Sequence, residues 1–155
     1  MTTKIEELED AVIALIKAEL PEIHTVKRYQ GDFDAEGLSA LKGLLPCALI
    51  LYGGASYGRR NQALTGTRRL TVFLGARNLR STTAARVDAY SLLEDVPGVI
   101  DHVALAVTGA TYYLDLLSET MIYHDGNMTI YAQDYEYPLH GRSDSRACGS
   151  FIANK

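Results

Sequence analysis

The chain has 155 residues, of which 47% are hydrophobic and 22% are charged, and its formal net charge is −4. This length is that of one domain, and the apolar content excludes a chain that is disordered throughout. The negative charge argues against a module that binds duplex DNA, because such a module needs clustered Lys and Arg to neutralise phosphates.

The sequence predicts a soluble protein of a reducing compartment. Its N-terminus carries acidic residues where a signal peptide needs a basic region, and no apolar run approaches the roughly 20 residues that span a bilayer. Of the two cysteines, Cys47 lies in an apolar run and is expected to be buried, whereas Cys148 lies in a polar tail. We therefore expect no disulfide between them.

Residues 3–20 have the periodicity of an amphipathic helix that lies on a core. Thr2 or Thr3 can cap the start of this helix, because a hydroxyl can accept from a free amide of the first turn. A strand over 23–29 and a short helix over 35–44 are predicted to follow.

The run CALILY, residues 47–52, is apolar on both faces and predicts a central strand that is covered on two sides. The segment 53–67 after it is rich in glycine and polar side chains, so it predicts a long mobile loop. Loops of this length inside a compact domain are often functional. The next strand is predicted over 69–75.

A second amphipathic helix is predicted over 82–95, ended by Pro97-Gly98. Its expected buried stripe is Val87, Tyr90, Leu93 and Val96.

Several short strands follow, and the last of them form a hairpin. Strands are predicted over 112–117, 120–124 and 128–137, and Asp125-Gly126-Asn127 joins the last two.

The fold class is therefore predicted to be α+β. We expect residues 1–137 to form a single domain, with a mixed or largely antiparallel sheet, two main amphipathic helices that flank it and a C-terminal β-hairpin. Residues 138–155 lose periodicity and predict a flexible C-terminal tail.

The sequence offers no set of residues that catalysis or ligand binding requires. The four histidines have neither an i, i+4 helical spacing nor a neighbouring cysteine pair, so no metal site is predicted. The glycines of 53–58 lack the lysine and the helix start that a phosphate loop needs. We therefore expect no catalytic residue, no cofactor and no metal.

Two groups of residues are candidates for an interface with another subunit or partner. Arg59, Arg60, Arg68 and Arg69 bracket the 53–67 segment. They are either a basic patch for an acidic partner or nucleic acid, or a solvated hairpin tip. Tyr131, Tyr135 and Tyr137 alternate on one face of the last strand. They indicate either a half-buried sheet face or a subunit interface, where tyrosine is enriched.

A strand, an Ala-Arg-Asn-Leu-Arg junction and a helix follow one another in residues 70–96, LTVFLGARNLRSTTAARVDAYSLLEDV. The chain also has an amphipathic opening helix, Leu45-Pro46 before its apolar strand and Gly53-Gly54 after it. This pattern resembles a family found in Mu-like phages and prophages, whose members lie in the tail-assembly gene region. The likeness extends over residues 3–137, and its motifs are structural rather than catalytic.

The resemblance implies a tail terminator, also called a tail completion protein, similar in architecture to the lambda tail terminator. Such proteins form a hexameric ring that caps the tail tube, stops its polymerisation and presents a surface to the head connector. The implied partners are further copies of the chain, the tail tube and sheath proteins, and the head connector proteins, while DNA only passes through the pore. The implied location is the virion, at the head–tail junction, and the host cytoplasm during assembly.

Other functions stay open at this point. The chain could be a different part of the head–tail junction, such as a head-completion or connector protein. It could also be a small enzyme or a ligand-binding domain that uses the 53–67 segment.

Overall fold

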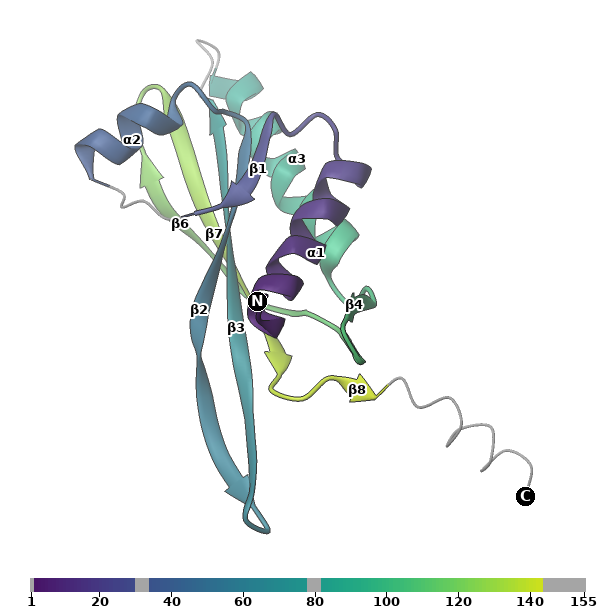
Figure 1. Cartoon of the computed structure of the whole chain (residues 1–155). Coiled ribbons are helices and arrows are strands. Elements are labelled where there is room, and N and C mark those ends of the chain that lie inside the picture. Colours follow the sequence, from purple (N-terminus) through teal and green to yellow (C-terminus); the bar gives the residue numbers. More distant parts are fainter. Residues whose placement is uncertain (1, 30–33, 78–81, 144–155) are drawn as a thin grey trace.

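The computed structural model describes residues 2–29, 34–77 and 82–143, with the backbone alone for 82–88 and 143. Three helices pack on a five-stranded sheet, and a small three-stranded sheet lies beside them (Figure 1). The predicted α+β fold class is confirmed. The helices are α1 (Lys4–Glu19), α2 (Ala35–Leu41) and α3 (Thr82–Ile100). The strands are β1 (Thr25–Arg28), β2 (Cys47–Arg60), β3 (Ala63–Arg77), β4 (Leu105–Val107), β5 (Ala110–Tyr112), β6 (Asp115–His124), β7 (Met128–Pro138) and β8 (Arg142–Ser143).

The main sheet has the strand order β1-β2-β3-β7-β6. Its first pair, β1 and β2, is parallel, and the other pairs are antiparallel. The smaller sheet has the order β4-β5-β8. None of the helices in the described part of the chain is both long enough and apolar enough to span a membrane.

The first helix begins where the sequence predicts. The Thr3 hydroxyl accepts a hydrogen bond from the amide of Glu6, and the Glu6 carboxylate accepts one from the amide of Thr3. This reciprocal pair satisfies two amides that a helix start otherwise leaves free. Every third or fourth residue is then buried against the sheet, including Leu8, Val12 and Ile16.

The first four residues of β2, 47–50, are buried on both faces of the sheet, as their apolar sequence predicts, whereas Leu51 in the same predicted run is 37% exposed. Ala48 and Ile50 belong to the core beneath α1 and α3, whereas Cys47 and Leu49 belong to a second core beneath α2. Figure 1 shows α2 on the opposite side of the sheet from α1 and α3. Burial raises the pKa of the Cys47 thiol to about 11, so Cys47 is an apolar packing residue.

The third helix does not end at Pro97, as the sequence analysis expected, but continues to Ile100. Proline removes the amide that would donate to the carbonyl four residues earlier, which is that of Leu93. The buried side chain of Gln133 on β7 donates to this carbonyl instead, over 3.0 Å from its Nε2. A residue far along the chain thus supplies the hydrogen bond that proline removes.

The buried stripe of α3 also differs from the predicted one. Of the predicted stripe, Val96 is buried and Leu93 is partly buried, but Tyr90 is 50% exposed. Among the described side chains of α3, Ala89, Leu92 and Ile100 are buried as well. The prediction favoured large apolar side chains, but the small Ala89 faces the sheet and allows close approach of the helix. The side chain of Val87 lies outside the described residues.

The prediction of a loop over 53–67 is wrong, because β2 and β3 continue through it as a two-stranded ribbon. The turn at its tip is Asn61-Gln62, and both residues have positive φ angles, of 52° and 67°. These angles suit the tight two-residue turn of a twisted hairpin. In Figure 1 the ribbon projects well beyond the rest of the molecule.

Residues 139–143, which the sequence analysis assigned to a tail, pack on the domain. Leu139 is buried, and its amide donates to the carbonyl of Gly66 on the ribbon. Strand β8 pairs with β5. Residues 144–155, with Cys148, lie outside the described residues.

Candidate interaction surfaces

The four candidate arginines lie on the ribbon at two separate levels. Arg59 and Arg60 are exposed beside the tip, whereas Arg68 and Arg69 lie at the base, opposite Ala55 and Gly54. No carboxylate of the described residues forms an ion pair with any of these arginines. The arginines therefore give the ribbon a positive charge along its length and do not form one patch.

A β-bulge turns the side chains of the ribbon. The pairing of β2 with β3 shifts between Tyr52 and Gly54, and Gly54 has a φ angle of 102°, which favours glycine. Beyond this bulge, Tyr57 and Arg59 lie on the same face as Leu64 of β3, because paired residues of neighbouring strands share a face.

We call this side, which carries Tyr57, Arg59, Leu64 and Arg68, the inner face of the ribbon. Tyr57 is 59% exposed and Leu64 is 40% exposed, although both are large and apolar. They line a hollow together with Arg59, Arg68 and Leu139. On the opposite face the side chains are polar or small, as at Ser56, Gly58, Arg60, Ala63, Thr65 and Thr67.

A groove of about 450 Å³ continues from the inner face toward the small sheet. Lys4, Arg68 and His140 line it, and none of the described residues that line it is acidic. The Nε atom of Arg68 is buried and has no partner among the described residues, and the same is true of the Tyr137 hydroxyl. Burial raises the pKa of Tyr137, and the charge of Arg68 partly opposes this shift.

Two of the candidate tyrosines cannot form an interface from the free surface. Tyr135 is 0% exposed and Tyr137 is 2% exposed, because β7 lies inside the sheet and α1 and α3 cover this face. Only Tyr131 is partly exposed. Tyr135 and Tyr137 therefore lie on a covered face of the sheet and do not reach the surface, where an interface would need them.

Exposed apolar residues gather instead on β6, the outer strand of the C-terminal hairpin. This strand is the last of the main sheet, so no strand pairs with its outer edge among the described residues, and only its start is covered, where the Leu116 amide donates to Asp101. Leu116, Leu117, Met121 and Ile122 are each at least 37% exposed, and we call them the β6 edge. The pairing of β6 with β7 shifts at two places, between Leu116 and Ser118 and between Met121 and Tyr123. The adjacent apolar pairs Leu116-Leu117 and Met121-Ile122 break the alternation of a regular strand, and this was the available signal.

Basic and acidic residues are separated along the chain to an unusual degree. Residues 37–87 contain eight Lys and Arg and no Asp or Glu, whereas residues 88–141 contain nine Asp and Glu and no Lys or Arg. The first range includes β2 and β3, and the second includes β6 and β7. A positive ribbon and a negative side of the main sheet, formed by β6 and β7, therefore lie on one chain.

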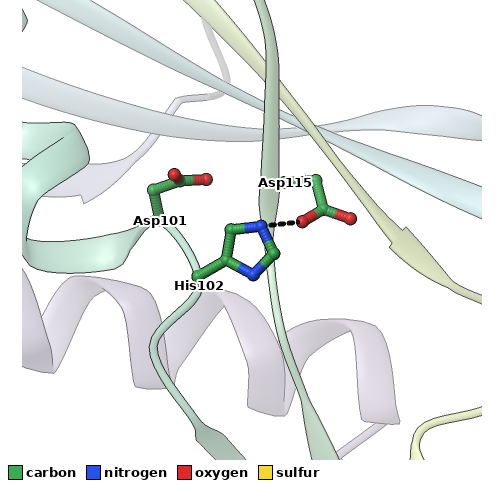
Figure 2. A group of neighbouring side chains, drawn as sticks. All are labelled: Asp101, His102 and Asp115. Carbon is green, nitrogen blue, oxygen red and sulfur yellow. Dashed lines mark ion pairs between the residues drawn. The ribbon is translucent and has the colours of Figure 1, made fainter.

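Three polar side chains meet where the chain enters β6 (Figure 2). The His102 Nε2 lies 2.7 Å from an Asp115 carboxylate oxygen, and Asp101 is close enough for the three to surround an ion. The Asp101 carboxylate already accepts a hydrogen bond from the amide of Leu116. Because His102 and Asp115 are largely exposed, their ion pair contributes little to stability.

Comparison with known families identifies the chain. The family model described as Bacteriophage Mu, Gp37 matches residues 4–139. The chain belongs to this family. The matched residues of the Mu Gp37 family run from the first turn of α1 to Leu139, so they include the ribbon and the β6 edge.

A solved structure has a similar fold. It is a chain of the "Virion of native gene transfer agent (GTA) particle", with a TM-score of 0.54 and 10% sequence identity. The alignment covers 91% of this chain and 100% of that chain. At this identity the likeness concerns the fold alone. No curated protein matches the sequence of the chain.

Proposed function

We propose that the chain is a tail terminator, or tail completion protein, of a phage-like particle. In this role it assembles into a ring, most simply of six copies, that caps the tail tube and stops its polymerisation. The ring then contacts the head connector, and the sheath and tube proteins are its other partners. Membership of the Mu Gp37 family and the likeness to a chain of a gene transfer agent virion support a role in a virion.

One observation carries the proposal of a ring. Each subunit has two different surfaces without a partner among the described residues, the inner face of the ribbon and the β6 edge. A ring forms when two unlike patches meet head to tail and the rotation closes. The negative charge of residues 88–141 is also compatible with DNA that passes through without binding, because binding needs neutralised phosphates.

Polymerisation of tube subunits in the presence of the purified protein tests the proposal. Tubes should stop growing when the protein is added, and electron microscopy should detect a ring at one tube end. Tubes that grow to the same length with and without the protein would exclude a terminator. Binding to heads but never to tube ends would favour a head-completion protein instead.

A further inference from the structure

We propose that the inner face of the ribbon of one copy docks against the β6 edge of the next copy. This inference rests on the proposed ring and names the two surfaces that close it. The occupant of both surfaces is therefore a second copy of this chain, and the contact is heterologous.

Large apolar side chains of both surfaces are exposed to water in the single chain. Tyr57 and Leu64 on the ribbon and Met121 on β6 are 40–59% exposed. A ribbon of two strands is marginally stable by itself in water, so the part of the ribbon beyond the core gains stability from a docked partner. Burial of these side chains supplies the driving force, and their clustering on one ribbon face and one sheet edge gives the contact its direction.

The charges of the two surfaces are complementary. The inner face and its groove carry Arg59, Arg68 and Lys4, and the described part of the chain places no acidic residue there. Asp115 and Glu119 lie on β6 beside its exposed apolar residues, in the part of the chain that has no Lys or Arg. Each already has one partner, since Asp115 pairs with His102 and Glu119 accepts a hydrogen bond from Gln133, but neither has a Lys or Arg beside it in the described structure. Opposite charges attract the two surfaces, whereas two ribbons or two β6 edges repel each other, which disfavours a symmetric dimer.

The backbone edges of both elements are also free. Strand β1 pairs with β2 only as far as Ile50, so the outer edge of β2 from Leu51 to Arg60 has no strand beside it in the described structure. The outer edge of β6 also has no strand beside it among the described residues, although at its start the Leu116 amide donates to Asp101. Unpaired strand edges readily accept strands of another chain.

Complementation between two variants tests a heterologous contact. Leu64→Glu places a charge on the inner face, and Met121→Glu places one on the β6 edge. Neither variant alone should form rings, but an equimolar mixture should form dimers, because the intact ribbon of one fits the intact edge of the other. The controls are Thr65→Glu and Thr120→Glu, which change the exposed neighbour on the opposite face of the same strand.

Light scattering after size-exclusion chromatography gives the masses, in free solution and with purified tail tubes. Wild-type protein that assembles under neither condition would contradict the proposed function itself. Rings that form as well with both variants as with wild type would contradict the docking contact and leave the function standing. The docking contact would also be contradicted if the two variants formed no dimers when mixed, because a heterologous contact should form between the intact ribbon of one variant and the intact edge of the other.

The basic ribbon could instead bind nucleic acid, and a gel-shift assay with duplex DNA distinguishes this explanation from docking of a second copy. We expect no binding that depends on Leu64 or the ribbon arginines. Binding that Leu64→Glu and Arg59→Glu abolish, with rings that Leu64→Glu leaves intact, would assign the inner face to nucleic acid and overturn the inference.

Discussion

The side chain of Gln133 joins β7, β6 and α3 although it is fully buried. Its Nε2 donates to the Leu93 carbonyl and to Glu119, over 3.0 Å and 2.7 Å, and its Oε1 accepts from the Tyr135 hydroxyl. A buried amide with these partners is stable, but without it the fully buried Tyr135 hydroxyl and the half-buried Leu93 carbonyl would lose a hydrogen-bond partner. The continuation of α3 through Pro97 therefore depends on one glutamine.

Gln133→Leu should lower the free energy of unfolding by about 1–3 kcal/mol for each buried group left unpaired. In a Pro97→Ala background the loss should be smaller by about 1 kcal/mol, because the backbone amide that alanine restores at this position can donate to the Leu93 carbonyl. Urea denaturation of the four proteins measures this coupling. If the effects of the two substitutions on the free energy of unfolding are additive within about 0.5 kcal/mol, Gln133 and Pro97 are not coupled through the Leu93 carbonyl.

The turn between β6 and β7 should be sensitive to acid. Hydrogen bonds from the Tyr123 hydroxyl and from the amides of Asn127 and Met128 lower the pKa of Asp125 to about 2. A carboxyl with a lowered folded-state pKa stabilises the fold above its unfolded pKa, and this contribution is lost as the pH falls through the folded value. The loss should therefore occur between about pH 4 and pH 2.

Nuclear magnetic resonance of the amide protons of Asn127 and Met128 follows this titration. Their shifts should change with a midpoint near pH 2, and Asp125→Asn should remove the change. A midpoint near the ordinary pKa of aspartate, about 4, would show that the hydrogen bonds do not hold the charged form.

At the scale of elements, the sequence was most informative where burial decides the structure. The stripe of α1 and the two-sided apolar run of β2 follow directly from periodicity, because a core accepts one arrangement of such residues. The ribbon was missed since its composition is that of a loop and its turn, Asn61-Gln62, lacks the glycine of the usual hairpin signal. The extent of α3 was missed because the group that replaces the proline amide comes from β7.

The candidate site was predictable in part. The sequence indicates that the four arginines bracket one segment, and a solvated hairpin tip is one of the two interpretations that it allows. It could not tell that Tyr135 and Tyr137 face the helices, because alternation along a strand does not say which face is covered. The β6 edge needed the strand order, which local patterns do not contain.

The ribbon should depend on Gly66. A Cβ atom at this position would lie 2.2 Å from the carbonyl oxygen of Ser56, so Gly66→Ala must separate the strands. At Gly58 a Cβ atom would meet only the Thr65 hydroxyl, at 3.5 Å, which makes Gly58→Ala a matched control. Hydrogen exchange of the amides of 54–67 should become faster by about tenfold or more in Gly66→Ala alone. Equal exchange in the two variants would contradict the close pairing at Gly66.

At the scale of the whole molecule, the separation of charge predicts how copies associate. The positive ribbon of one copy attracts the negative side of the sheet, β6 and β7, of another copy. Salt should weaken this attraction, because the screening length falls from roughly 30 Å at 0.01 M to roughly 3 Å at 1 M. The separation is a property of the whole chain: eight basic residues precede nine acidic ones without mixing over residues 37–141.

Arg59→Glu with Arg60→Glu should weaken self-association by about tenfold at low salt, and the difference from wild type should shrink as salt rises. Lys17→Glu with Lys27→Glu changes the charge equally at exposed sites on α1 and β1 and should have little effect. Analytical ultracentrifugation over a salt series measures both. An equal effect of the two double variants would mean that net charge alone controls association.

The two shifts of register in β6 have a consequence for growth. A straight strand edge can template one strand after another, and the product is a fibre with no fixed length. In β6, the breaks at Leu116/Ser118 and at Met121/Tyr123 interrupt the ladder, so no long uniform row of donors and acceptors is available. A strand with an exposed apolar edge is thus a poor template for amyloid-like stacking, which protects the chain from aggregation at high concentration.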